Sequence, residues 1–265
     1  MNPNRIDNYL ALLGVPRPPS PDPETLAELQ WRHLLTVPFE NLDIHMGRPL
    51  SLDEDALLAK ILDRRRGGLC YELCGAFAVL LRELGYRVTL SSAYTYDGSG
   101  CVGIPFDHLA LRVDLEHPWL VDVGFGRFTH RPIRLDLRTD QVDPGGVFRI
   151  VDGEHGEVDV LHDGKRAYRL EPRPRVSGDF VTGCWWHQTA PTSRFTHSPV
   201  CSLALPDGRI TISDRTLIRT TGTDRHEERL VDDAALLAAY REYFGITLDR
   251  VPGRPTNASI PVDAP

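Results

Sequence analysis

The chain lacks the patterns that mark several classes of protein. Its five cysteines are scattered and odd in number, and no Cys-x-x-Cys pair occurs, so neither a tetrahedral zinc site nor a secreted disulfide framework is expected. No apolar run could span a bilayer, and the start, MNPNRIDNYL, lacks the plan of a signal peptide. The net charge of -7 argues against a nucleic-acid partner. We therefore expect a cytoplasmic protein with no metal, membrane or nucleic-acid partner.

The first third of the sequence has helical periodicity. Helices are predicted within residues 6–14, 22–35 and 51–68, and Ser51 and Glu54 have the spacing of a capping box at the start of the third. A further helix runs from Cys70 to the stop at Gly85. Its apolar residues are predicted to form one amphipathic stripe, made of Leu69, Leu73, Ala76, Leu80 and Leu84.

The rest of the chain alternates in polarity as strands do. The strands are predicted at 87–96, 106–115, 118–126, 147–153, 157–164 and 168–174. Residues 202–222 read as a strand, an Asp-Gly turn and two more strands, and 230–245 as a helix capped by Asp232 or Asp233. Helices followed by strands and then a mixed end predict an α+β fold with three sub-regions. The tail, 251–265, is rich in proline and small residues and is predicted to be loose.

Cys70 lies in RGGLCYEL, where two glycines lead into a helix. A thiol is a strong nucleophile as a thiolate, which the free N–H groups of a helix start stabilise. Arg64, Arg65 and Arg66 are expected to add positive potential, with at least two of them simply solvated. The alternative interpretation is a small buried core residue, because free cysteine is among the most buried residue types.

A nucleophilic cysteine needs a base, and the base needs an orienting group. If the turn after the strand of FDHLALRVDL centres near Glu116, His108 and Asp122 share one face as diagonal neighbours. A one-residue slip would place them on opposite faces. An aspartate among Val, Leu and Gly is costly to bury alone, so a partner is expected, either His108 or a backbone or arginine donor.

Together these stretches resemble the arylamine N-acetyltransferase family. The motifs that carry the resemblance, in the family's order, are TVPFENL (36–42), RGGLCYEL (66–73), LGYRVTLSSAYTY (84–96), DHLALRV (107–113), WLVDVGFG (119–126), TSRFTHSPVCSLALPDGRITISDRTLIR (192–219) and YREYFGITL (240–248). The resemblance implies a catalytic triad of Cys70, His108 and Asp122 in a cysteine-protease-like arrangement. It also implies three parts: a helical domain (1–86), a β-barrel (87–190) and an α/β lid (191–250), before the loose tail (251–265).

The family's activity is a ping-pong transfer of acetyl from acetyl-CoA to an arylamine, arylhydrazine or N-hydroxyarylamine. Acetyl-CoA is then the acyl-donor substrate, and no cofactor is implied. Phe39 and Phe125 match positions that line the family's acceptor pocket, although either could be ordinary core. The main alternative is a related amide synthase that releases a carrier-bound polyketide chain onto an aromatic amine. A cysteine peptidase or transglutaminase-like protein would not explain VPFEN and VDVGFG, and an inactive binding module would be expected to lack a triad member.

One residue departs from the family's pattern. The family's string usually continues Glu-x-Asn, whereas here Glu72 and Leu73 are followed by Cys74. A thiol is a weaker hydrogen-bonding group than an amide. Cys74 is interpreted as an apolar filler one turn beyond Cys70, the alternative being a strained reversible disulfide between the two.

Overall fold

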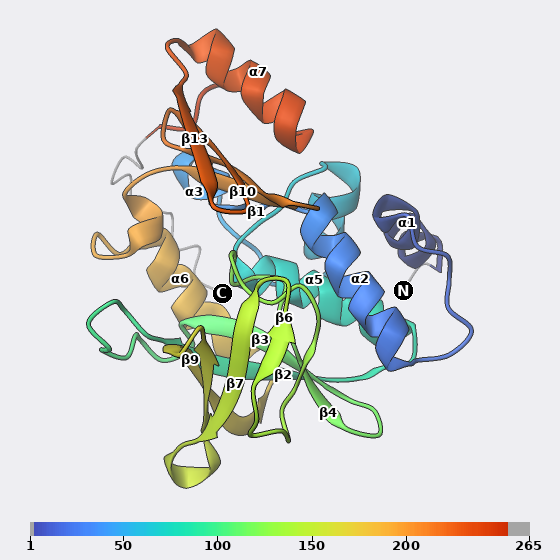
Figure 1. Ribbon diagram of the computed structural model, residues 1–265. Helices are drawn as coiled ribbons and strands as arrows, with labels where there is room; N and C mark the ends of the chain where they lie inside the picture. The colour runs from blue at the N-terminus through green and yellow to red at the C-terminus, as the bar shows by residue number, and fades with distance from the viewer. Residues whose placement is uncertain (1–2, 254–265) are drawn as a thin grey trace, which may run out of the picture.

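The computed structural model describes residues 3–253, and their elements form three packed parts (Figure 1). The N-terminal part is helical, as predicted. Its elements are α1 (Pro3–Leu13), α2 (Pro23–Thr36), α3 (Leu42–His45), α4 (Glu54–Leu58), the π-helical turn η1 (Ala59–Asp63) and α5 (Cys70–Glu83). The predicted capping box at Ser51 is wrong. Asp53 is the N-cap of α4 and accepts from the Ala56 N–H at 3.0 Å, because the helix begins only at Glu54.

Helix α5 forms the centre of the N-terminal part. The predicted start at Cys70 is confirmed, and Gly85, with φ +90°, follows the last turn. The prediction of a single apolar stripe is wrong, because eleven of the fourteen residues of α5 are buried. The helix is covered by α4 and by strands of the barrel, and Figure 1 shows it between the barrel and the C-terminal sheet.

The middle part is an antiparallel sheet of eight strands in the order β5-β4-β3-β2-β9-β8-β7-β6. These strands are β2 (Arg87–Thr95), β3 (His108–Asp114), β4 (Pro118–Val121), β5 (Ile133–Arg134), β6 (Gln141–Asp143), β7 (Gly146–Asp152), β8 (Val158–His162) and β9 (Lys165–Arg175). The Gln141 side chain accepts from the Arg134 N–H at 2.7 Å and donates to its carbonyl at 2.9 Å. This contact links the two edge strands, so the sheet forms a nearly closed barrel.

The pairing of β3 with β4 decides where the two candidate catalytic groups lie. Leu111 pairs with Val121 and Asp114 with Pro118, which is the register predicted from a turn at Glu116. The predicted strand at 118–126 is too long, however. β4 ends at Val121, so Asp122 is the first residue of the turn that follows the strand.

The C-terminal part is a five-stranded sheet in the order β1-β10-β11-β12-β13 with α7 packed on it (Figure 1). Its elements are β1 (Phe39–Glu40), β10 (Val200–Leu205), β11 (Gly208–Ser213), β12 (Thr216–Thr221), β13 (Asp224–Arg229) and α7 (Asp233–Phe244). Asp232 is the N-cap of α7. Helix α6 (Val181–Thr189) and the 3-10 turns η2 (Glu154–Gly156), η3 (Ser177–Phe180) and η4 (Arg194–Thr196) complete the fold.

The α+β class is confirmed, with the helical, barrel and α/β parts in the predicted order. The first strand of the C-terminal sheet, β1, comes from the helical segment, and the boundaries at 86, 190 and 250 stay a prediction. Most of the predicted loose tail, 254–265, lies outside the described residues. Within residues 3–253, none of the helices combines the length and apolar character needed to cross a membrane.

Candidate active site

Cys70 is the first residue of α5 and is only 5 % exposed. The Glu72 carboxylate accepts from the Leu69 N–H at 3.0 Å and so closes the helix start around the cysteine. The barrel packs directly on this turn, since a Cβ added at Gly124 would lie 2.6 Å from the Cα of Cys70. Only glycine lets the two backbones approach this closely.

A buried ionic cluster, made of Glu40, Asp43, Lys60, Arg66 and Glu72, lies behind the start of α5. The Lys60 ammonium is 2.7 Å from Glu72 and 2.8 Å from Asp43, and the Arg66 guanidinium is 2.8 Å from Glu40 and 3.1 Å from Asp43. Burial would lower the pKa of Lys60, but the charges of Glu72, Glu40 and Asp43 raise it above its usual value.

This cluster corrects one expectation about Cys70. Arg66 was expected to add positive potential at the thiol, but its charge is matched by two buried carboxylates, Glu40 and Asp43. Arg64 and Arg65 are exposed. The helix start and His108 are therefore the positive features that remain beside Cys70.

His108 and Asp122 are both buried and lie 2.7 Å apart, from imidazole Nε2 to carboxylate Oδ2. The predicted shared face is confirmed by this contact. Burial by itself would lower the pKa of His108, but the charges of Asp122 and Cys70 and the side-chain contacts with both raise it to about 10. At neutral pH the imidazole therefore carries a proton and a positive charge.

Asp122 accepts hydrogen bonds at both carboxylate oxygens. Oδ1 accepts from the N–H groups of Gly124 at 2.9 Å and Phe125 at 3.0 Å, and Oδ2 accepts from the hydroxyl of Tyr168 on β9 at 3.0 Å. The Cys74 thiol is the remaining donor, with Sγ 3.9 Å from Oδ1. Burial raises the pKa of Cys74 well above its usual value, so the thiol keeps its proton.

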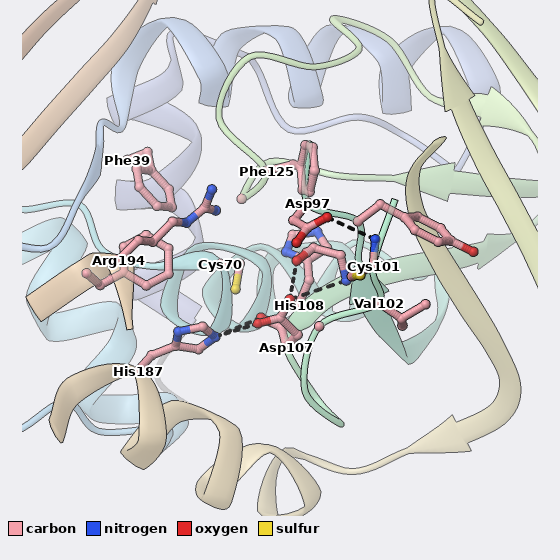
Figure 2. A pocket seen from close by; sticks show the side chains of 15 residues that line it. Phe39, Cys70, Asp97, Cys101, Val102, Asp107, His108, Phe125, His187 and Arg194 are labelled. Carbon is pink, nitrogen blue, oxygen red and sulfur yellow. Dashed lines mark hydrogen bonds and ion pairs between the residues drawn. The ribbon is translucent and has the colours of Figure 1, made fainter. Parts of the chain in front are cut away.

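Cys70 and His108 open into one cavity of about 220 Å³. Phe39 and Phe125, the two predicted pocket residues, both line it. Figure 2 shows Phe39 on one side of Cys70, with His187 and Arg194, and Phe125 on the other side, with the loop that carries Asp97, Cys101 and Val102. The structure thus brings all five predicted site residues to one place, although their roles stay a prediction.

A second histidine–aspartate pair borders the same cavity. His187 of α6 lies 2.9 Å from Asp107, the residue before His108, and its other ring nitrogen lies 3.2 Å from the Ser193 hydroxyl. Asp107 also accepts from the Thr95 N–H at 3.2 Å. Hydrogen bonds to His187 and Thr95 outweigh burial and lower the pKa of Asp107. This pair ties α6 to the strand that carries His108.

Several of these contacts leave no signal in the sequence. Tyr168 is 46 positions from Asp122 and His187 is 80 from Asp107, so no local pattern signals either contact. Arg194 stands inside a motif of the resemblance, but nothing in that motif marked it as facing a cavity. Among residues 3–253, no three His, Cys, Asp or Glu side chains are grouped so that they could hold a metal ion.

Comparison with known proteins is consistent with this geometry. The family model described as "N-acetyltransferase" matches residues 22–252. The arylamine N-acetyltransferase of Mycolicibacterium smegmatis is 33% identical, with 96% of each chain covered. The solved arylamine N-acetyltransferase of Salmonella typhimurium superposes with a TM-score of 0.86 at 29% identity, covering 96% of this chain and 95% of that one. That of Mycobacterium marinum in complex with CoA gives 0.83 at 30% identity, covering 91% and 92%.

Proposed function

The chain belongs to the arylamine N-acetyltransferase family, and we propose that it moves an acetyl group from acetyl-CoA to an aromatic amine or hydrazine through an acetyl-thioester on Cys70. An N-hydroxyarylamine would be accepted by the same route. Acetyl-CoA acts here as a substrate. We place the reaction in the cytoplasm, because the five cysteines of the described chain are free thiols, as in a reducing compartment.

In the first half reaction, the thiolate of Cys70 attacks the thioester carbonyl of acetyl-CoA. A bond forms between Sγ and the carbonyl carbon, and the bond from that carbon to the CoA sulfur breaks. The CoA thiolate leaves with the proton of the His108 imidazolium, so CoA departs as a thiol and His108 is left neutral. Exchange of one thioester for another changes the free energy little.

In the second half reaction, the amine nitrogen attacks the acetyl carbon on Cys70. Neutral His108 accepts the N–H proton while the Cys70 thiolate leaves, which restores the thiolate and imidazolium of the resting enzyme. Asp122 receives the Nε2–H of His108 at 2.7 Å and fixes the ring, which leaves the other nitrogen to exchange the proton with the substrate.

One observation carries the proposal: a cysteine at a helix start shares a cavity with a histidine that a buried aspartate holds. The cavity of about 220 Å³ lies below the usual range for drug-sized ligands, which suits an acceptor of one substituted aromatic ring. The size gives no support to the alternative, a carrier-bound polyketide chain folded inside the site.

Intact-protein mass spectrometry tests the proposal. Mixed with acetyl-CoA alone, the wild-type chain should gain the mass of one acetyl group and lose it when an arylamine is added. Cys70→Ala should gain none, and Cys101→Ala, which removes the exposed thiol, should still be acetylated. Acetylation of Cys70→Ala at the wild-type rate would contradict the proposal. A wild-type chain inert to acetyl-CoA but acylated by a carrier-bound thioester would be an amide synthase.

A further inference from the structure

Arg194 is held at the edge of the cavity by its backbone. It begins the 3-10 turn η4, whose N-cap Ser193 is buried and accepts from the Phe195 N–H at 3.3 Å. The Arg194 guanidinium carbon lies 4.8 Å from the centroid of the Phe195 ring, so the side chain rests on an aromatic face. Arg194 and Cys70 line the same cavity, and Figure 2 shows Arg194 beside Phe39.

The other charged groups that face this cavity already have partners. His108 pairs with Asp122 at 2.7 Å, and His187 with Asp107 at 2.9 Å. Asp97, on the opposite side of Cys70, accepts from the N–H groups of Ser99 and Cys101 at 2.8 and 2.9 Å. Within the part of the chain that the structure describes, no carboxylate lies within ion-pair distance of Arg194. Arg194 is exposed at the edge of the cavity, and its guanidinium is therefore free to bind a ligand there.

We propose that Arg194 is a specificity-determining residue that binds a carboxylate on the ring of the aromatic acceptor. The inference rests on the proposed function, because it assigns the acceptor class of that same site. A guanidinium presents paired N–H donors that match a carboxylate, and such charge-assisted hydrogen bonds are the strong ones. Since Arg194 and Cys70 border one small cavity, a single ring can place its amine at the acetyl-thioester and its carboxylate at Arg194.

A guanidinium could equally bind a phosphate of the acyl donor, but the position of Arg194 does not suit that partner. The phosphates of CoA are separated from the sulfur by the whole pantetheine arm, whereas Arg194 borders the cavity that holds Cys70. A phosphate partner would also act in the first half reaction, and a carboxylate on the acceptor only in the second. Kinetics can separate these two sources.

The experiment compares 4-aminobenzoate with its methyl ester, which keeps the ring and the electron-withdrawing group but removes the charge. Steady-state kcat/KM is measured for both acceptors with wild type, Arg194→Gln and Arg194→Lys. Arg173→Gln is the matched control, because it removes one exposed charge from β9, outside the cavity. Each acceptor is measured with acetyl-CoA and again with 4-nitrophenyl acetate, a donor without phosphates.

In Arg194→Gln, the ratio of kcat/KM for the acid to that for the ester should fall at least tenfold with either donor, as expected for loss of a charge-assisted hydrogen bond. Arg194→Lys should restore part of the ratio, and Arg173→Gln should leave it at the wild-type value. An equal loss for acid and ester would overturn the proposal. If Arg194→Gln instead lowered kcat/KM for acetyl-CoA but not for 4-nitrophenyl acetate, and left the acid-to-ester ratio unchanged, Arg194 would belong to the donor site and the proposal would also be overturned. Failure of the wild type to acetylate either acceptor would count against the proposed function instead.

Discussion

Buried carboxylates lie on two sides of the start of α5, three on one side and one on the other, and the two sides are neutralised in different ways. Behind the helix start, Glu40, Asp43 and Glu72 face Lys60 and Arg66, whose charges are permanent at physiological pH. On the side of the cavity, Asp122 faces His108, the residue type whose charge can change near neutral pH. All four carboxylates are buried, and Asp122 also accepts from two backbone N–H groups and the Tyr168 hydroxyl.

This difference suggests a structural role for the ionic cluster and a role in proton transfer for the His108–Asp122 pair. Lysine and arginine cannot easily release a proton, so the ionic cluster fixes the chain from β1 to α5 and with it the position of Cys70. A histidine with a carboxylate partner can hold a proton in one half reaction and give it up in the next. Breaking the ionic cluster should therefore affect stability above all, and breaking the His108–Asp122 pair should affect the rate.

The largest effect is expected from Asp122→Asn. The asparagine keeps the shape of the side chain but can donate to His108 Nε2, which favours the wrong tautomer and removes the charge that stabilises the imidazolium. We expect kcat to fall on the order of 10⁴-fold while circular dichroism stays that of the wild type. Acetyl transfer to an arylamine, followed by chromatography, measures the loss. A variant within tenfold of wild type would show that the pair does not drive the reaction.

The same variant gives a pH test. The folded-state pKa of His108 is about 10 against an ordinary value of 6.5, so the stability it contributes is full below pH 6.5 and is lost as pH rises through 10. In Asp122→Asn burial dominates, and the imidazole should be neutral at pH 7. Iodoacetamide labelling of Cys70 at pH 6–7 should then be slower than in wild type, with exposed Cys101 as the internal reference. The difference in urea stability between the two proteins should shrink between pH 6.5 and 10.

The second-largest effect is expected from Lys60→Met, which breaks the buried ionic cluster. The substitution leaves three buried carboxylates with one cation, Arg66, and removes the ammonium 2.7 Å from Glu72. Loss of one partner from a buried ion pair costs about 3–5 kcal/mol, which is a large part of the stability of an ordinary domain. Urea unfolding followed by tryptophan fluorescence measures the change in the free energy of unfolding.

Two further variants sharpen this result. Arg64→Met removes an exposed basic residue four positions away and should change the free energy of unfolding by less than about 0.5 kcal/mol. Lys60→Met combined with Glu72→Gln removes both charges and should be more stable than Lys60→Met alone. If Lys60→Met matched Arg64→Met, the ionic cluster would not be what holds the helix start.

The His108–Asp122 side of this comparison could be predicted from the sequence, because its signals are local. The β3–β4 turn is short and alternation along both strands is regular, so one register brings His108 and Asp122 together, and that register is observed. The helix start at Cys70 follows from two glycines before an apolar helical pattern. The resemblance added Phe39 and Phe125, which no spacing rule would place in the cavity.

The buried ionic cluster could not be predicted from the sequence, because its contacts join distant segments. Lys60 and Glu72 are twelve residues apart, but Glu40 and Arg66 are 26 apart and come from a strand and a loop whose approach depends on the whole fold. The single stripe predicted for α5 failed for a related reason. Periodicity shows which face of a helix is apolar, but it does not reveal that other elements cover the remaining faces.

The smallest effect is expected from Cys74→Ala, although this residue replaces the family's usual asparagine and touches Asp122. The Sγ–Oδ1 distance of 3.9 Å is long, a thiol is a weak donor, and Oδ1 keeps the N–H groups of Gly124 and Phe125. We expect kcat/KM to fall less than tenfold and the free energy of unfolding to fall by about 1 kcal/mol relative to wild type. The pH profile of Cys70 labelling should stay unchanged. A loss close to that of Asp122→Asn, with a shifted profile, would show instead that the thiol positions the carboxylate. In that case the ionic cluster around Glu72 and the His108–Asp122 pair would be linked through one turn of α5.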